Sequence, residues 1–439
     1  MNPVEAIGVR TMSKIKWRLI PFVLILYIIN YIDRSNIGFA ALTMNKELAI
    51  SASAFGALSA VFFVPYFFCE VPSNLLLHRY GARKWIARIM VTWGIVTTLA
   101  MFAQNYWHIY AVRFFLGMME AGFFPGILFY FTLWFPQKER AKVVALFMLA
   151  MPASNFIAAP ISGWILDSIH WLGLGGWRWL FFWEGVPAVI LGIITWFFLT
   201  NSPDEAKWLT AEEKKWLITK LEQENTTKSG GGTRHVKFME MFSDLRVWRI
   251  GIIYMVFAMA SNALMMWNAI IIKDFAQVSN TTVGFLSMVP SLFGMIAMPL
   301  WAMHSDKTGE RKYHVIIAIS VATIGALLTV FGPNPTVKLI GLVINSIGSL
   351  SALGPFWTIP TLFLAGASAA IGTAVINSCN SLGGFFTGYI TGYLKGAFGS
   401  NGVLLFVCLC YIVGMVILAT MPLKKEEGQQ VKSMNSASN

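Results

Sequence analysis

The chain has 439 residues, of which 56% are hydrophobic and only 12% are charged. This composition excludes an ordinary soluble domain and indicates an integral membrane protein. The net charge of +12 does not predict a nucleic-acid partner, because basic residues of a multi-span chain collect in its cytoplasmic loops. All four cysteines lie in apolar runs without the spacing of a metal site or a disulfide framework. We therefore expect no nucleic acid, no metal and no cofactor.

Twelve apolar segments are each long enough to cross a bilayer as a helix. They are predicted near residues 18–41, 54–77, 85–103, 107–134, 142–167, 178–200, 248–272, 282–304, 313–331, 336–364, 369–394 and 402–421. With the N-terminus inside, 26 Lys and Arg residues fall in cytoplasmic segments, five fall in outer segments, and Arg34 and Arg113 lie within spans. This asymmetry predicts a multi-pass protein of the inner cell membrane with both termini cytoplasmic.

The spans divide into two halves that repeat each other. His-Arg-Tyr-Gly-Ala-Arg-Lys at 78–84 follows the second span, and Asp-Lys-Thr-Gly-Glu-Arg-Lys at 306–312 follows the eighth, an offset of 228 residues. Such a repeat is typical of transporters built from two related bundles around a midplane site. We predict a six-helix bundle at 1–200, a cytoplasmic linker at 201–247, a second six-helix bundle at 248–421 and a cytoplasmic tail at 422–439.

The linker carries its own local signals. Thr210 and Glu213 form a capping-box pattern ahead of a charged amphipathic helix. The stretch 228–234, with three consecutive glycines, predicts a flexible connection.

Four charged residues inside the spans are the strongest functional signal: Asp33 and Arg34 in the first span, and Arg113 and Glu120 in the fourth. Centring one such charge in a bilayer costs on the order of 3 kcal/mol, so these residues normally pair, face a polar cavity and mark a transport route. Their depths favour an Asp33–Arg113 pair and leave Arg34 to bridge between Glu120 and a substrate. Desolvation favours a proton on Glu120. The competing interpretation is that the pairs only lock the first and fourth helices together.

The second half offers no matching charge. With the 228-residue offset, Asp33 and Arg34 fall on Ser261 and Asn262, and Arg113 and Glu120 fall on glycines. Any ionic chemistry must therefore be carried out by the first half, with amides and aromatic residues opposite.

Several motifs together resemble the anion:cation symporter branch of the major facilitator superfamily. They are Tyr-Ile-Asp-Arg-Ser-Asn-Ile-Gly-Phe-Ala at 31–40, the stretch 113–125, Trp-Phe-Pro at 134–136, Gly-Trp-Arg-Trp at 176–179 and Ile-Asn-Ser-Cys-Asn-Ser-Leu-Gly-Gly at 376–384. The resemblance covers essentially the whole chain and is closest to permeases for tartrate, phthalate, hydroxyphenylacetate and sugar acids. It implies an all-α fold of twelve transmembrane helices, alternating access, and uptake of a small organic anion with protons. One departure is His78, where the loop motif usually has an acid.

The candidate site combines the intramembrane charges with positions implied by the resemblance. Proton coupling is expected at Asp33 and Glu120, and substrate binding at Arg34 and Arg113, because of their charge and depth. The resemblance implies that Tyr31, Tyr66, Trp357 and Asn377 line the cavity, and Asn380 is a further substrate-binding candidate. Members of this family that carry sugar acids also use an amide side chain of the fifth helix. In this chain Ser154 and Asn155 are only nearby candidates for that contact. The expected partners are a small organic anion, protons and the lipid bilayer, with the protein a monomer.

Other features leave alternatives open. Glu70 and Glu184 either belong to a proton path or pair locally and serve structure. Glycines at 384, 388, 392 and 396, and at 122 and 126, predict close helix packing. The runner-up function is an organic-anion exchanger or uniporter without proton coupling. A membrane-embedded enzyme is disfavoured, because the spans carry no metal, nucleophile or phosphate-loop motif. The sequence does not name the carboxylate.

Overall fold

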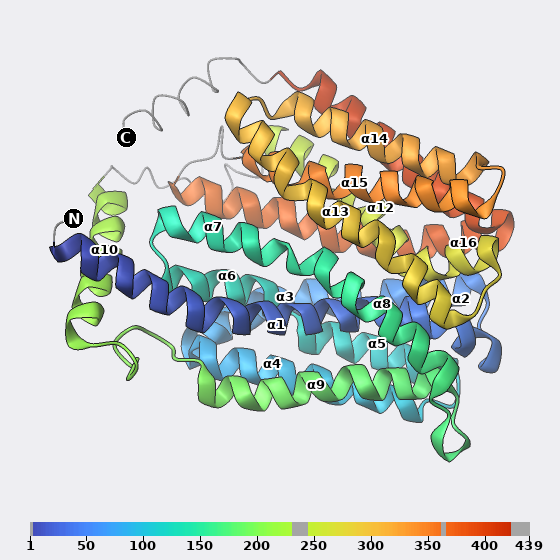
Figure 1. Ribbon diagram of the computed structural model, residues 1–439, viewed down its shortest axis with the longest axis horizontal. Coiled ribbons are helices and arrows are strands. Elements are labelled where there is room, and N and C mark those ends of the chain that lie inside the picture. Colours follow the sequence, from blue (N-terminus) through green and yellow to red (C-terminus); the bar gives the residue numbers. More distant parts are fainter. Residues whose placement is uncertain (1–2, 231–244, 361–365, 423–439) are drawn as a thin grey trace. The chain divides into compact units, whose positions relative to one another are not determined.

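The computed structural model describes residues 3–230, 245–360 and 366–422, and every regular element in these ranges is a helix (Figure 1). The chain forms two compact units, which are described separately. The first contains Met1–Asn36, Val64–Ser154 and Arg178–Arg234, and the second contains Ile37–Phe63, Asn155–Trp177 and His235–Asn439.

The first unit is built mainly from helices of the N-terminal half of the chain. They are α1 (Pro3–Glu47), α3 (Phe63–Tyr80), α4 (Ala82–Leu99) with the 3₁₀ turn η1 (Ala100–Phe102), α5 (Tyr106–Glu120), α6 (Phe123–Trp134), α7 (Gln137–Met148), α8 (Ala150–Ser168), α9 (Gly176–Phe198) and α10 (Ala211–Gly230). Four of these helices are divided between the units: α1 and α8 continue into the second unit, and α3 and α9 begin in it by one and two residues.

The second unit contains the helices of the C-terminal half. Besides the last part of α1 and most of α8 it holds α2 (Ala52–Val61), the 3₁₀ turn η2 (Trp171–Gly173), α12 (Leu245–Ala276), α13 (Asn280–Thr308), α14 (Lys312–Phe331), α15 (Pro335–Thr358) and α16 (Gly366–Thr420).

Within the described ranges, eleven helical segments are long and apolar enough to cross a membrane. The last of them is interrupted at Gly399, whose φ of 65° and ψ of −159° are not helical. This residue divides α16 into the two predicted spans 369–394 and 402–421. The all-helical, twelve-span fold class is therefore confirmed, although residues 361–364 of the predicted tenth span lie outside the described ranges.

The glycine stripe of α16 packs against α2. A Cβ added at Gly388 would lie 2.5 Å from the carbonyl oxygen of Gly56, and one at Gly392 would lie 2.9 Å from the Cα of the same residue. Only glycine lets the two backbones approach this closely. The packing role predicted for the stripe is thus confirmed at these positions.

The fourth span is broken in its middle, which the sequence interpretation missed. Helix α5 ends at Glu120, and α6 begins at Phe123 after Gly122, whose φ is +90°. A Cβ at Gly122 would also lie 2.4 Å from Oγ of Ser73 on α3. Gly122 is therefore needed both for the left-handed turn and for close packing.

The linker helix α10 lies beside the N-terminal end of α1 (Figure 1). Its predicted capping box is confirmed: the backbone N–H of Thr210 donates to Glu213 Oε2 (2.9 Å), and the N–H of Glu213 donates to Thr210 Oγ1 (3.3 Å). Residues 228–230 of the predicted flexible stretch are helical, and residues 231–234 lie outside the described ranges.

Candidate functional site

The break in the fourth span places Glu120 at the C-terminal end of α5. Its side chain is fully buried in the first unit. Oε1 accepts hydrogen bonds from α1, whereas Oε2 is buried without a hydrogen-bond donor in the described part of the chain. A buried carboxylate oxygen without a hydrogen-bond donor costs free energy when the carboxylate is charged.

One face of α1 supplies both groups that hold Glu120. Asn30 and Arg34 are four residues apart and so lie on the same side of the helix. Asn30 Nδ2 donates to Glu120 Oε1 at 2.8 Å, and Arg34 Nε forms a hydrogen-bonded ion pair with the same oxygen. The predicted bridge from Arg34 to Glu120 is present in the structure.

Arg34 remains partly accessible on its other side. Its side chain is 19% exposed, whereas that of Glu120 is 0% exposed. The guanidinium carbon lies 5.1 Å from the ring centroid of Tyr66 on α3. Tyr31, one turn before Arg34, is half-buried, and its ring packs edge-on against Tyr27 at 5.2 Å between centroids. The cation is therefore held by an acid beside an aromatic ring, and part of its side chain remains exposed.

Asp33 accepts hydrogen bonds from two side chains that were not predicted to pair with it. Its carboxylate accepts from Asn36 Nδ2 (3.1 Å) and from Thr97 Oγ1 on α4 (3.2 Å). Successive helical residues point about 100° apart. Because Arg34 turns toward the end of α5, Asp33 turns toward α4. The Asp33–Thr97 contact was not predicted, and the expected pairing of Asp33 with Arg113 stays a prediction.

Two further buried charges complete this part of the first unit. Arg113 is 5% exposed and lies within electrostatic range of Glu120 and Asp33. Glu184 on α9 is 6% exposed and lies within electrostatic range of Asp33. This part of the first unit therefore brings the acids Asp33, Glu120 and Glu184 together with the cations Arg34 and Arg113, one more acid than cation.

The remaining predicted residues lie in the second unit. Trp357 lies in the last turn of α15 and packs edge-on against Tyr254, with 4.8 Å between ring centroids. Asn377 and Asn380 lie on α16 and are half-buried. Their predicted participation in one cavity with Arg34 stays a prediction.

Some polar residues of the second unit have structural roles instead. Trp267 is buried, and its Nε1 donates to Thr391 Oγ1 at 2.8 Å. Asn155 Nδ2 donates to Ser291 Oγ at 2.7 Å, so this fifth-helix amide is engaged within the protein.

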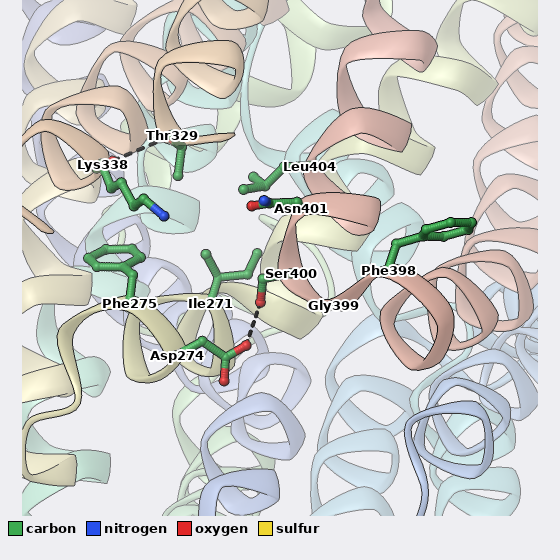
Figure 2. A pocket seen from close by; sticks show the side chains of 10 residues that line it. All are labelled: Ile271, Asp274, Phe275, Thr329, Lys338, Phe398, Gly399, Ser400, Asn401 and Leu404. Atoms are coloured by element: carbon green, nitrogen blue, oxygen red, sulfur yellow. Dashed lines mark hydrogen bonds between the residues drawn. The ribbon is translucent and has the colours of Figure 1, made fainter. Parts of the chain in front are cut away.

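A separate cavity of about 250 Å³ opens in the second unit beside Gly399, where α16 is interrupted (Figure 2). Asp274 on its wall accepts a hydrogen bond from Ser400 Oγ (2.6 Å) and pairs with Lys395. None of the predicted site residues lines it. The cavity is therefore distinct from the intramembrane charges.

The protein-family model of the Major Facilitator Superfamily matches residues 23–388 of this chain. The chain belongs to the major facilitator superfamily. The "Putative tartrate transporter" of Agrobacterium vitis is 42% identical over 435 residues, which cover 99% of this chain and 95% of that protein. The "Inner membrane transport protein RhmT" of Escherichia coli K12 is 32% identical over 425 residues, which cover 95% of this chain and 96% of that protein.

A solved member of the same fold agrees with the helical architecture. The D-xylose-proton symporter superposes with a TM-score of 0.75 at 15% identity, covering 94% of this chain and 99% of that chain. At this identity the likeness concerns the fold alone. As a major facilitator protein, the chain is a multi-pass membrane transporter and not an enzyme. Its full-length relatives agree with the predicted resemblance to anion:cation symporter-like permeases.

Proposed function

We propose that this transporter carries a small organic carboxylate into the cell together with protons, by alternating access. The observation that carries the proposal is the Arg34–Glu120 ion pair inside the membrane-spanning part of the first unit. An Arg fork binds a carboxylate in two parallel hydrogen bonds and stays protonated. A substrate carboxylate and an ionised Glu120 compete for that fork.

This competition provides the coupling. When Glu120 takes up a proton, it releases Arg34, which then binds the substrate. When the substrate leaves, Arg34 again stabilises the charged form of Glu120, which favours proton release. Proton and substrate thus bias the same two states, as symport requires. Asp33 and Glu184 are the other buried acids on which a second proton would reside.

The substrate class is proposed from chemistry and from the relatives. A cation, an aromatic side chain such as Tyr66 and amides suit a sugar acid, a tartrate-like acid or an aromatic acid. The tartrate-transporter name of the Agrobacterium relative supports the carboxylate. We propose an inner-membrane location with both termini cytoplasmic and a monomeric protein. The name of the Escherichia relative supports the membrane assignment.

The test begins with thermal-shift screening of the purified protein against tartrate, gluconate, galactonate and phthalate, because a ligand that binds the folded state raises its melting temperature. The stabilising acid is then radiolabelled and followed into proteoliposomes with an inward proton gradient. We expect accumulation that a protonophore abolishes, while counterflow persists. Counterflow without any gradient-driven accumulation would instead identify an exchanger or a uniporter.

A further inference from the structure

A cavity of about 610 Å³ lies in the first unit between the N-terminal part of α1 and the segment that follows α9. Its wall includes Lys14, Trp17, Arg18 and Phe22 of α1, together with Phe198 and Trp208. The transport site does not use any of these residues. The cavity combines two cations with several aromatic rings, and these cations have different partners.

Most cations of this region are neutralised by acids. Lys14 and Arg10 both pair with the buried carboxylate of Glu213, at 2.9 and 3.2 Å, and Lys16 pairs with Glu139 at 2.6 Å. Arg18 differs, because no carboxylate in the described ranges forms an ion pair with it. Its guanidinium instead lies between two rings, 4.6 Å from the centroid of Phe198 and 5.1 Å from that of Trp208.

Two hydrogen-bond donors at this wall also lack acceptors. Arg18 Nε and Trp208 Nε1 are buried and have no hydrogen-bond partner within the described residues. Leaving such a donor unsatisfied costs about 1–3 kcal/mol. Unsatisfied buried groups in a native protein call for an explanation, and an acceptor from outside the chain is one. Two adjacent donors, one of them cationic, suit an anion with several oxygens.

The position along α1 indicates what kind of anion fits. Lys14 precedes the first apolar span and Arg18 begins it, and the cavity wall continues through Phe22 to Ile25. Trp17 is 80% exposed and Ile25 is 46% exposed. The helix rises by roughly 16 Å from Lys14 to Ile25. The wall therefore changes from charged to apolar over a headgroup and the start of an acyl chain. Exposed Trp at the end of a span is typical of the membrane interface.

We propose that this cavity binds an anionic phospholipid, with its phosphodiester on Arg18 and its acyl chain along Phe22 and Ile25. The planar fork of Arg matches phosphate oxygens, and basic pockets at the ends of spans are suited to acidic headgroups. A water-soluble phosphate would use the cationic end alone and gain nothing from the apolar wall. Glu213 contributes by neutralising Lys14 and Arg10, which leaves Arg18 as the anion-binding cation.

Native mass spectrometry of the full-length protein in detergent tests the proposal, with phosphatidylglycerol and phosphatidylcholine of matched acyl chains added at equal concentrations. We expect phosphatidylglycerol to bind the wild type at least tenfold more tightly. Arg18→Gln should abolish this preference, and Arg18→Lys should retain part of it. The control Lys142→Gln removes an exposed cation outside the cavity and should leave the preference intact.

Equal binding of the two lipids to the wild type would overturn the proposal, and this comparison does not depend on how well any variant folds. An equal loss of preference in Lys142→Gln would also overturn it, since net charge alone would then account for the binding. A third arm adds sn-glycerol 3-phosphate. Displacement of the lipid by this soluble phosphate at equal concentration would identify a soluble-anion site and contradict the role of the acyl chain.

Discussion

Arg34 of α1 and Glu120 of α5 share a hydrogen-bonded ion pair although they are 86 residues apart. Asn30 donates to the same carboxylate oxygen, so the hydrogen-bond donors that hold Glu120 within the described residues both come from α1. The Arg34 side chain is 19% exposed, whereas that of Glu120 is fully buried. A partly exposed cation on a buried acid suits an exchange of partners better than a permanent lock between helices.

Arg34→Lys should weaken substrate binding by about 10- to 100-fold, because a charge-assisted hydrogen bond contributes about 1.5–3 kcal/mol and the bidentate fork is lost. The measurement is a binding isotherm with the acid selected by thermal shift. Arg79→Lys, at an exposed position, is the matched control and should bind normally. Unchanged affinity in Arg34→Lys would mean that the anion is bound elsewhere.

Gly388→Ala should lower the apparent melting temperature of the purified protein, because the added Cβ would lie 2.5 Å from the Gly56 carbonyl oxygen. Overpacking of this kind typically costs about 1–3 kcal/mol. Gly396→Ala is the control on the same stripe, since its Cβ would make only ordinary contact at 3.8 Å with Ser53. Equal melting temperatures for the two variants would contradict the predicted α16–α2 contact.

The predicted orientation is tested by labelling single cysteines in intact cells. In a background without the four native cysteines, Lys46→Cys should react with a membrane-impermeant maleimide and Lys207→Cys should not. Both lysines are exposed, so accessibility within the protein does not distinguish them. Both should react in permeabilised cells. Labelling of Lys207→Cys in intact cells would reverse the topology.

Docking of α10 on α1 should depend on acid pH through Glu213. Burial raises the pKa of this carboxyl, but hydrogen bonds from Lys14 and the Thr210 backbone, with the charges of Lys14 and Arg10, outweigh that effect. The pKa consequently lies below its ordinary value of 4.5. Because the pKa of Glu213 is lower when α10 is docked, its ionised carboxylate stabilises docking at pH values above the pKa of the undocked state. This stabilisation is lost as the pH falls through the pKa of the docked state.

Hydrogen exchange of the α10 amides measures this effect. Protection in the wild type should fall as the pH drops below about 4.5, after correction for intrinsic exchange. Glu213→Gln keeps an acceptor for Thr210 but has no charge to lose, so its protection should be lower at neutral pH and flatter across this window. If amide protection falls with pH in the same way in the wild type and in Glu213→Gln, the acid sensitivity belongs to another group.

The sequence was sufficient for features that depend on local pattern. Apolar length predicted the spans, and the spacing of Thr210 and Glu213 predicted their reciprocal cap. Counting depth along two spans also predicted that Arg34 reaches Glu120, because axial rise per residue is nearly constant in a helix.

The features that were missed depend on how helices turn toward one another. Asp33 accepts a hydrogen bond from Thr97 on another span, and no spacing within one span encodes that contact. Glu184 is a single acid in an apolar run, so its proximity to Asp33 depends on the packing of α9. The break at Gly122 was hidden because a glycine on a helix face predicts packing as readily as a left-handed turn.

The central claim, that Glu120 carries the coupling proton, is tested most directly by Glu120→Gln in proteoliposomes. The amide mimics the protonated carboxyl and leaves Arg34 free for substrate, but it cannot exchange a proton. The variant should therefore retain substrate counterflow while losing accumulation driven by an inward proton gradient. If Glu120→Gln still concentrates substrate when protons are driven inward, the coupling role belongs to another acid, and the account is wrong.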